Sequence, residues 1–216
     1  MATYLDLINK VLVRLRETEA LTPNDNEYTQ LVGFMVNDAK NVVESAWDWA
    51  NLRTTKTVST TVGVSAASIA GTGQNYKFMD AYNATTQSRL QLITQNEMNT
   101  KTVLNTAASD SPSEFSLGAI DSSGNQAITL YPTPDGSYTL KFDMIVREAA
   151  LELAADVTNL PVQPVVLYAW AMATRERGET GGMSAQEIFG LADKALGDAL
   201  SLEAHRYQAE LTWRAV

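Results

Sequence analysis

The sequence predicts an α+β protein: a discontinuous four-helix-type bundle with an antiparallel β-sandwich or barrel-like domain inserted between its two halves. Both ends of the chain repeat apolar side chains at helical spacing, whereas the middle alternates apolar and polar residues and is rich in Thr, Ser and Gly. Each terminal pair of helices carries an apolar stripe that it cannot bury alone, so we expect the two pairs to pack together. The predicted domains are residues 1–50 with 159–216, and residues 51–158.

The first predicted helix opens on a capping signal, because Thr3 and Asp6 have the spacing at which each side chain satisfies a backbone N–H of the other. Apolar residues then share one helical face; they are Tyr4, Ile8, Val11, Leu12 and Leu15. A polar turn at 21–26 leads to a longer second helix over 28–46, which ends near Trp47-Asp48-Trp49.

The middle of the chain predicts strands, because alternation of apolar and polar residues is typical of half-buried strands and Gly, Asn, Ser and Pro clusters separate the alternating runs. The candidate strands cover 54–61, 76–79, 90–93, 115–117, 127–131 and 138–146. A short helix is expected over 95–104, followed by an exposed polar loop at 105–113.

The turn at 132–137 is the strongest local signal in the sequence. Two prolines restrict φ there, and Asp135-Gly136 supplies a residue that tolerates positive φ. Alternating apolar residues follow; they are Tyr138, Leu140, Phe142, Met144 and Val146. We therefore expect a half-buried hairpin that joins strands 127–131 and 138–146, with an exposed tip.

Helices return after a connector over 149–158 that ends at Leu160-Pro161. An apolar stripe from Val162 to Ala173 predicts a helix that closes at Gly178. Ser184 and Glu187 then form a second capping box. In the last helix one face carries apolar and small residues; they are Ile188, Leu191, Ala192, Ala195, Ala199 and Leu202.

Composition excludes several classes of function. A formal charge of −9 and a pI near 4.6 argue against tight nonspecific binding to nucleic acid, which depends on clustered Lys and Arg. The absence of cysteine excludes disulfides, thiolate nucleophiles and zinc-thiolate sites. The charged residues among the first sixteen do not suit a signal peptide. The longest apolar run, 165–173, is far below the roughly 20 residues that cross a bilayer, so we expect no membrane association.

The search for chemistry predicts no catalytic, cofactor or metal site. His205 is the one histidine, and no nucleophile accompanies it in the sequence. Asp121, Asp135 and Asp143 suit turns or a solvent face better than the paired carboxylates of a glycoside hydrolase. The segment 71–73 lacks the Lys and Ser or Thr of a phosphate loop. We expect a protein that is not an enzyme, with an acidic hydrolase as an alternative.

The four tryptophans divide into two groups. Trp47, Trp49 and Trp170 join apolar helical stripes and are expected in the core. Trp213 lies in a polar tail, where a large aromatic side chain either anchors a partner protein or packs locally.

Several segments, taken in order, carry a resemblance to a known family. These are 4–9, 47–49, 76–80 followed by 90–93, the Tyr-Pro-Thr-Pro run at 131–134, and 175–179. They span nearly the whole chain, which resembles the head-to-tail adaptor proteins of tailed bacteriophages and looks most like the tail-tubular-A or gatekeeper-type adaptors. One departure is Phe78-Met79-Asp80, where such proteins often have Leu-Pro-x-Asp, so that turn need not take the family's form.

The resemblance implies a structural virion protein at the head-tail junction, assembled in the host cytoplasm. It implies a homo-oligomeric ring, usually of twelve copies, below the portal protein. Such a ring extends the DNA channel and attaches a nozzle or tail-tube protein. The acidic composition suits this role, because a negative wall lets double-stranded DNA pass without specific binding. We expect the helical bundle to supply most subunit contacts.

The resemblance also suggests two groups of contact residues. The C-terminal segment would reach the portal, through His205, Arg206, Tyr207, Trp213 and Arg214. A loop of the β domain would face the tail or a neighbouring subunit, through Pro132, Thr133, Pro134 and Asp135 or through 105–113. The alternative is a carbohydrate- or receptor-binding tail protein in which residues 51–158 form the binding module.

Overall fold

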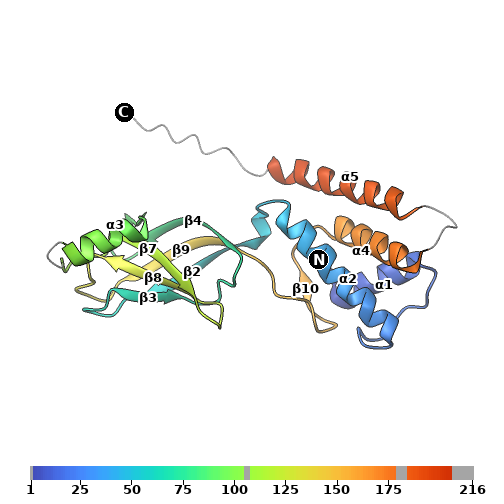
Figure 1. Ribbon diagram of the computed structural model, residues 1–216, viewed down its shortest axis with the longest axis horizontal. Coiled ribbons are helices and arrows are strands. Elements are labelled where there is room, and N and C mark those ends of the chain that lie inside the picture. Colours follow the sequence, from blue (N-terminus) through green and yellow to red (C-terminus); the bar gives the residue numbers. More distant parts are fainter. Residues whose placement is uncertain (1, 105–107, 179–183, 206–216) are drawn as a thin grey trace. The chain divides into compact units, whose positions relative to one another are not determined.

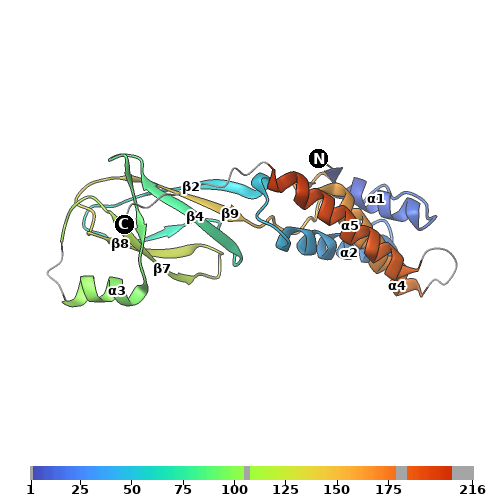
Figure 2. The same cartoon turned by 90° about the horizontal axis from the view of Figure 1, so that it is seen from above.

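The computed structural model describes residues 2–104, 108–178 and 184–205, and the chain divides into two compact units. A helical unit comprises residues 1–51 and 148–216, and a β unit comprises residues 52–147 (Figures 1 and 2). The predicted α+β class with an inserted β domain is confirmed. Residues 148–158, which the sequence assigned to the β-rich segment, belong instead to the helical unit.

Four helices build the helical unit: α1 (Tyr4–Arg14), α2 (Glu27–Ser45), α4 (Val162–Arg177) and α5 (Ala185–Ala204). Helix α4 is central, because it contacts the other three. Both predicted capping boxes are present, at Thr3 with Asp6 and at Ser184 with Glu187. Gly178 ends α4 in the left-handed conformation, with φ of 62°.

The N-terminus is held to the returning chain by a short two-stranded ribbon. Its strands are β1 (Ala2–Thr3) and β10 (Val157–Thr158), which pair antiparallel. Helix α1 then packs closely on α2, because Gly33 of α2 leaves room for the Tyr4 ring. A Cβ atom at Gly33 would lie 2.3 Å from the Tyr4 hydroxyl oxygen, so only glycine permits this approach.

Two four-stranded sheets build the β unit. The strands of the first sheet lie in the order β2 (Arg53–Ser59), β9 (Thr139–Val146), β4 (Tyr76–Asn83) and β5 (Ser88–Arg89). The strands of the second sheet lie in the order β3 (Ala66–Ile69), β8 (Gln126–Tyr131), β7 (Glu114–Ile120) and β6 (Gln91–Leu92). All pairs are antiparallel except β6 with β7. A 3₁₀ turn, η1 (Ala50–Leu52), precedes the first sheet, and α3 (Gln95–Asn99) continues into a π-helical turn, η2 (Thr100–Leu104). The short strands β3 and β5 were not predicted.

The sheets share one core, as the predicted sandwich requires. Phe142 of the first sheet packs edge-on against Phe115 of the second, with ring centroids 5.3 Å apart. Phe78 contacts Phe115 in the same way at 5.4 Å. Alternate residues of β8 and β9 complete the core, including Ile128 and Leu140.

The predicted hairpin at 132–137 is wrong. Strands β8 and β9 lie on either side of this turn but belong to different sheets, so the turn carries the chain from one layer of the sandwich to the other. Both strands present an apolar face to the same core, and strands can do this either side by side in one sheet or from opposite layers. Sequence alternation predicts the buried face of a strand but not its hydrogen-bonding partner.

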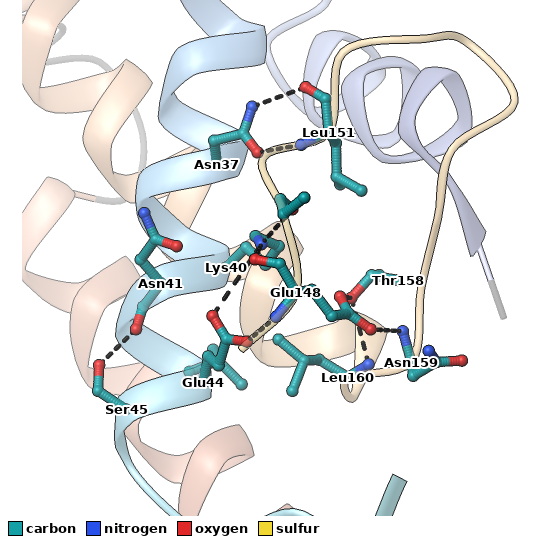
Figure 3. Close-up of polar contacts among 12 residues, drawn as sticks. Asn37, Lys40, Asn41, Glu44, Ser45, Glu148, Leu151, Thr158, Asn159 and Leu160 are labelled. Carbon is teal, nitrogen blue, oxygen red and sulfur yellow. Dashed lines mark hydrogen bonds and ion pairs between the residues drawn. The ribbon is translucent and has the colours of Figure 1, made fainter. Parts of the chain in front are cut away.

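A buried polar network fixes the chain where it returns to the helical unit (Figure 3). The Lys40 ammonium group donates to the backbone carbonyls of Glu148 and Ala149, at 3.0 and 2.8 Å, and lies 4.0 Å from the Glu44 carboxylate. Glu44 accepts the Glu148 N–H at 2.6 Å. The Asn37 side-chain amide accepts the Leu151 N–H at 2.9 Å and donates to the Leu151 carbonyl at 3.0 Å. We call Asn37, Lys40, Glu44 and Glu148 the return latch.

The Glu148 side chain extends the latch to the start of α4. Its carboxylate accepts the Thr158 hydroxyl at 2.8 Å and the Asn159 N–H at 2.7 Å. The side chains of Lys40 and Glu44 are each 1% exposed, so water cannot replace these partners. Residues 148–151 are therefore held on α2 by hydrogen bonds to Asn37, Lys40 and Glu44, and Glu148 in turn holds Thr158 and Asn159, although this segment forms little regular structure.

We predict that Lys40→Ala destabilises the helical unit by about 3–5 kcal/mol, because it leaves Glu44 as a buried charge without its cation and two carbonyls without their donor. All four tryptophans lie outside residues 52–147, so tryptophan fluorescence during urea unfolding reports on the helical unit alone. Exposed Lys10→Ala is the control, with a change within about 0.5 kcal/mol. A loss below about 1 kcal/mol for Lys40→Ala would contradict the prediction.

We predict that Gly33→Ala destabilises the helical unit by about 1–3 kcal/mol, because the new methyl group overlaps the Tyr4 hydroxyl. Gly190→Ala in α5 is the matched control: nothing lies within 4 Å of its Cβ position, so it should stabilise by up to about 1 kcal/mol. Adding Tyr4→Phe should recover part of the Gly33→Ala loss in the same fluorescence assay. Equal effects of the two glycine substitutions would refute the steric account.

Candidate interaction surfaces

Several loops gather at one end of the β unit. Strands β2 and β9 run antiparallel, with Arg53 opposite Ile145 at one end and Ser59 opposite Thr139 at the other. The chain thus enters and leaves the β unit at the first end. Of the loops at the second end, we call three the distal loop surface: residues 60–65, 108–113 and 132–138.

Hydrogen bonds hold these loops together. The buried Thr60 hydroxyl donates to the Gly136 carbonyl at 3.0 Å and accepts the Tyr138 N–H at 2.8 Å. The Gly63 N–H donates to the Pro134 carbonyl at 2.8 Å. On the other side, Thr133 exchanges backbone hydrogen bonds with residues 108 and 110, at 2.9 and 3.0 Å. The two loops that the sequence proposed as contacts therefore lie side by side.

The exposed part of this surface differs from the prediction. Pro132 and Thr133 are half-buried and Pro134 is buried, so Asp135 alone of the four predicted residues is exposed. Asp135 accepts a hydrogen bond from the Tyr138 hydroxyl, which raises the pKa of Tyr138. The tip of the turn is thus held in place by hydrogen bonds and carries one exposed carboxylate, that of Asp135.

Two exposed valines on the distal loop surface were missed by sequence reasoning. Val62 is 61% exposed and Val64 is 44% exposed, on either side of the positive-φ residue Gly63. The sequence did contain a signal for this exposure, because a tight loop cannot bury both of the apolar residues that flank a turn glycine. Together with Asp135 they give this end apolar and acidic contact groups.

The C-terminal contact residues are only partly within the described structure. His205 is the exposed C-cap residue of α5, and its Nδ1 atom lies 2.6 Å from the Ser201 carbonyl. Arg206, Tyr207, Trp213 and Arg214 lie outside the described residues.

The three tryptophans predicted in the core do not share one environment. Trp49 is buried and donates from its ring N–H to the Val43 carbonyl at 2.9 Å. Trp170 is half-buried. Trp47 is 40% exposed, contrary to expectation, because the chain turns beyond the C-cap of α2 at Ala46 and the ring leaves the helical stripe.

A groove between α2 and α4 holds a cavity of about 330 Å³. Two methionines and three charged residues line it: Met35, Asp38, Met172, Arg175 and Glu176. Phe34, next to Met35 in α2, is 67% exposed. The groove is therefore apolar at its floor and charged at its rim, with a large exposed aromatic side chain beside it.

Helix α5 also leaves apolar side chains outside the core. Leu191 is 42% exposed and Leu202 is 73% exposed. On another flank of the helix, Asp193 accepts the Tyr168 hydroxyl at 2.5 Å, and burial together with this bond raises the pKa of Tyr168 to about 12. Helix α5 is thus held to α4 on one side and carries exposed leucines on another.

The carboxylates considered for catalysis have structural partners. Asp121 accepts the N–H groups of Ser123 and Asn125 in its own turn, at 2.8 and 2.9 Å. Asp143 pairs with Arg53 at 3.2 Å. Across the described ranges, no group of three or more His, Cys, Asp or Glu side chains is placed to hold a metal ion. None of the described helices combines the length and apolar character needed to cross a bilayer.

The comparisons with known proteins agree with the resemblance in the sequence. A family model described as SU10 adaptor protein matches residues 2–214, whereas a search of curated proteins finds no match. This family is a structural one and not a family of enzymes, and its members are virion components. Because the match covers nearly the whole chain, the protein belongs to the SU10 adaptor family and is a structural head-to-tail adaptor of a bacteriophage.

Proposed function

We propose that the protein forms a ring of twelve copies below the portal, extends the DNA channel and attaches the tail, as a tail-tubular-A or gatekeeper-type adaptor does. The observation that carries the ring is that the described residues leave two different surfaces of the helical unit exposed. One is the α2 and α4 groove beside Phe34, and the other is the exposed leucine edge of α5. A ring needs two different contact faces on every subunit.

Passage of double-stranded DNA without specific binding fits the composition. A formal charge of −9 on each copy would give a ring of twelve a strongly negative field that repels phosphates. We place assembly in the host cytoplasm, before incorporation into the virion. The chain should show little affinity for DNA at physiological salt.

The tail or nozzle contact is assigned to the distal loop surface. Its loops brace one another, which pre-organises Val62, Val64 and Asp135 for a partner and lowers the entropy cost of binding. The half-buried Pro132 and Thr133 and the buried Pro134 support this surface from beneath.

The portal contact is assigned to the C-terminal segment that follows α5. His205 begins this segment, and Arg206, Tyr207, Trp213 and Arg214 supply aromatic and cationic side chains of the kind that dominate interface energies. Stable contacts of the ring should each bury at least about 1,000 Å².

We predict that deleting residues 210–216 abolishes binding to the portal protein of the same phage, because the deletion removes Trp213 and Arg214. Co-sedimentation with the purified portal, followed by electron microscopy, measures binding and ring formation. The truncated chain should keep its circular dichroism spectrum and its melting temperature. Full binding by the truncated chain would overturn the portal assignment, and binding by the intact chain without rings would overturn the ring.

We predict that Val62→Asp combined with Val64→Asp blocks tail attachment, because two buried carboxylates would be left unpaired in the interface. Phage that carry the double substitution should accumulate filled heads without tails, counted by electron microscopy. Ala70→Asp is the control, since Ala70 is exposed in the same unit but lies outside the distal loop surface. A normal yield of tailed particles from the double variant would exclude this surface as the tail contact.

A further inference from the structure

The exposed leucines of α5 form a continuous line. Leu191, Ala195, Asp198 and Leu202 follow one another at spacings of four, three and four residues, so they share one helical face. Leu191 is two residues on from Phe189, a rotation of roughly 200°. Because Phe189 packs on Tyr168 of α4, this line lies on the flank turned away from that contact.

Charged residues accompany the line of leucines. Asp198 lies between Leu191 and Leu202, and Lys194 is one turn beyond Leu191; both charged side chains are exposed. We call Leu191, Lys194, Asp198 and Leu202 the α5 ridge. It presents two apolar side chains with one charge of each sign between them.

The groove between α2 and α4 offers the complementary pattern. Met35 and Met172 form an apolar floor, and methionine adapts readily to the shape of a partner side chain. Arg175 on the rim can pair with the acid of the ridge, and Asp38 or Glu176 can pair with its lysine. Arg175 now lies over the Phe189 ring, 5.6 Å from its centroid, and so is held at the rim.

We propose that the α5 ridge of one copy docks into the α2 and α4 groove of a second copy, with Asp198 facing Arg175 and Lys194 facing the rim carboxylates. The contact joins two different surfaces, so it repeats head to tail and generates a ring when the rotation between copies closes. This assignment rests on the proposed ring and names the helix faces that build it. The apolar residues give the affinity, and the opposed charges set the register.

Cysteine cross-linking tests the pairing directly, because the natural chain contains no cysteine. Phe34→Cys marks the groove side and Leu191→Cys marks the ridge. A short bismaleimide reacts irreversibly, so even weak encounters accumulate as product. An equimolar mixture of the two full-length single variants should give covalent dimers, and the double variant should give a ladder of larger species.

Two controls limit the interpretation. Each single variant alone should give no dimer, because the groove does not meet a groove; strong dimers from either one would indicate a two-fold contact and overturn the pairing. Lys10→Cys on exposed α1 replaces Phe34→Cys in a matched mixture with Leu191→Cys. Equal cross-linking with Lys10→Cys would show random collision and would also overturn it.

Charge reversal tests the register. Arg175→Glu or Asp198→Arg alone should lower the yield of the groove-to-ridge dimer by at least about tenfold, because like charges then face each other. The two reversals together should restore the yield. The fluorescence-detected unfolding midpoint should fall only slightly, because Arg175→Glu also removes the contact with the Phe189 ring. If the combination is no better than either single reversal, this register is wrong.

The outcomes separate the pairing from the ring itself. Light scattering on the same samples shows whether the chain assembles, with the purified portal added in a parallel set. Rings without groove-to-ridge cross-links would overturn the pairing and leave the proposed function standing. A chain that stays monomeric in both sets, without cross-links, would overturn both.

Discussion

The fold depends on the burial of a lysine in the face of α2 that receives the returning chain. Lys40 is almost fully buried, yet it meets two backbone carbonyls and an acidic neighbour, so its charge is compensated. A buried ion pair adds little net stability by itself, but breaking one is costly. The return latch therefore acts as a constraint: the connector can occupy one register on α2, and other registers would leave charges unpaired.

This constraint explains how a discontinuous unit stays one unit. The chain leaves the helices after Asn51 and comes back at Glu148, so almost a hundred residues separate the two halves of the helical unit. Loop-closure entropy rises only slowly with length, and a rigid insertion with adjacent ends lowers the cost further. The pairing of β2 with β9 brings those ends together, and the latch then fixes the second of them.

The exposed apolar surfaces of both units consist of side chains that the two cores do not bury. Helix α4 is covered by three neighbouring helices, whereas α5 packs mainly on α4 and otherwise reaches the Ala50 N–H through the buried Glu203 carboxylate at 2.7 Å. Leu191 and Leu202 consequently remain outside, as does Phe34 on α2. In the β unit, the sandwich core buries the alternating apolar faces of the strands, and the apolar residues that stay exposed include the loop valines Val62 and Val64. The uncovered groups thus occupy separate places in the two units, as an adaptor with several partners requires.

The sequence by itself determined the helices, their caps and the inserted β region, because these depend on short-range spacing such as that of Thr3 with Asp6 and Ser184 with Glu187. It also singled out the loop at 132–137 and the α5 stripe. Only the tertiary structure decided that β8 and β9 belong to different sheets, that Pro134 is buried, that Trp47 is exposed, and that Lys40 is a core residue. The physical reason is that spacing along the chain reports which side of an element is apolar, whereas partners, register and exposure are set by residues far away in sequence. Asn37, Lys40 and Glu44 read as ordinary polar positions of α2 until residues more than a hundred positions later pack against them.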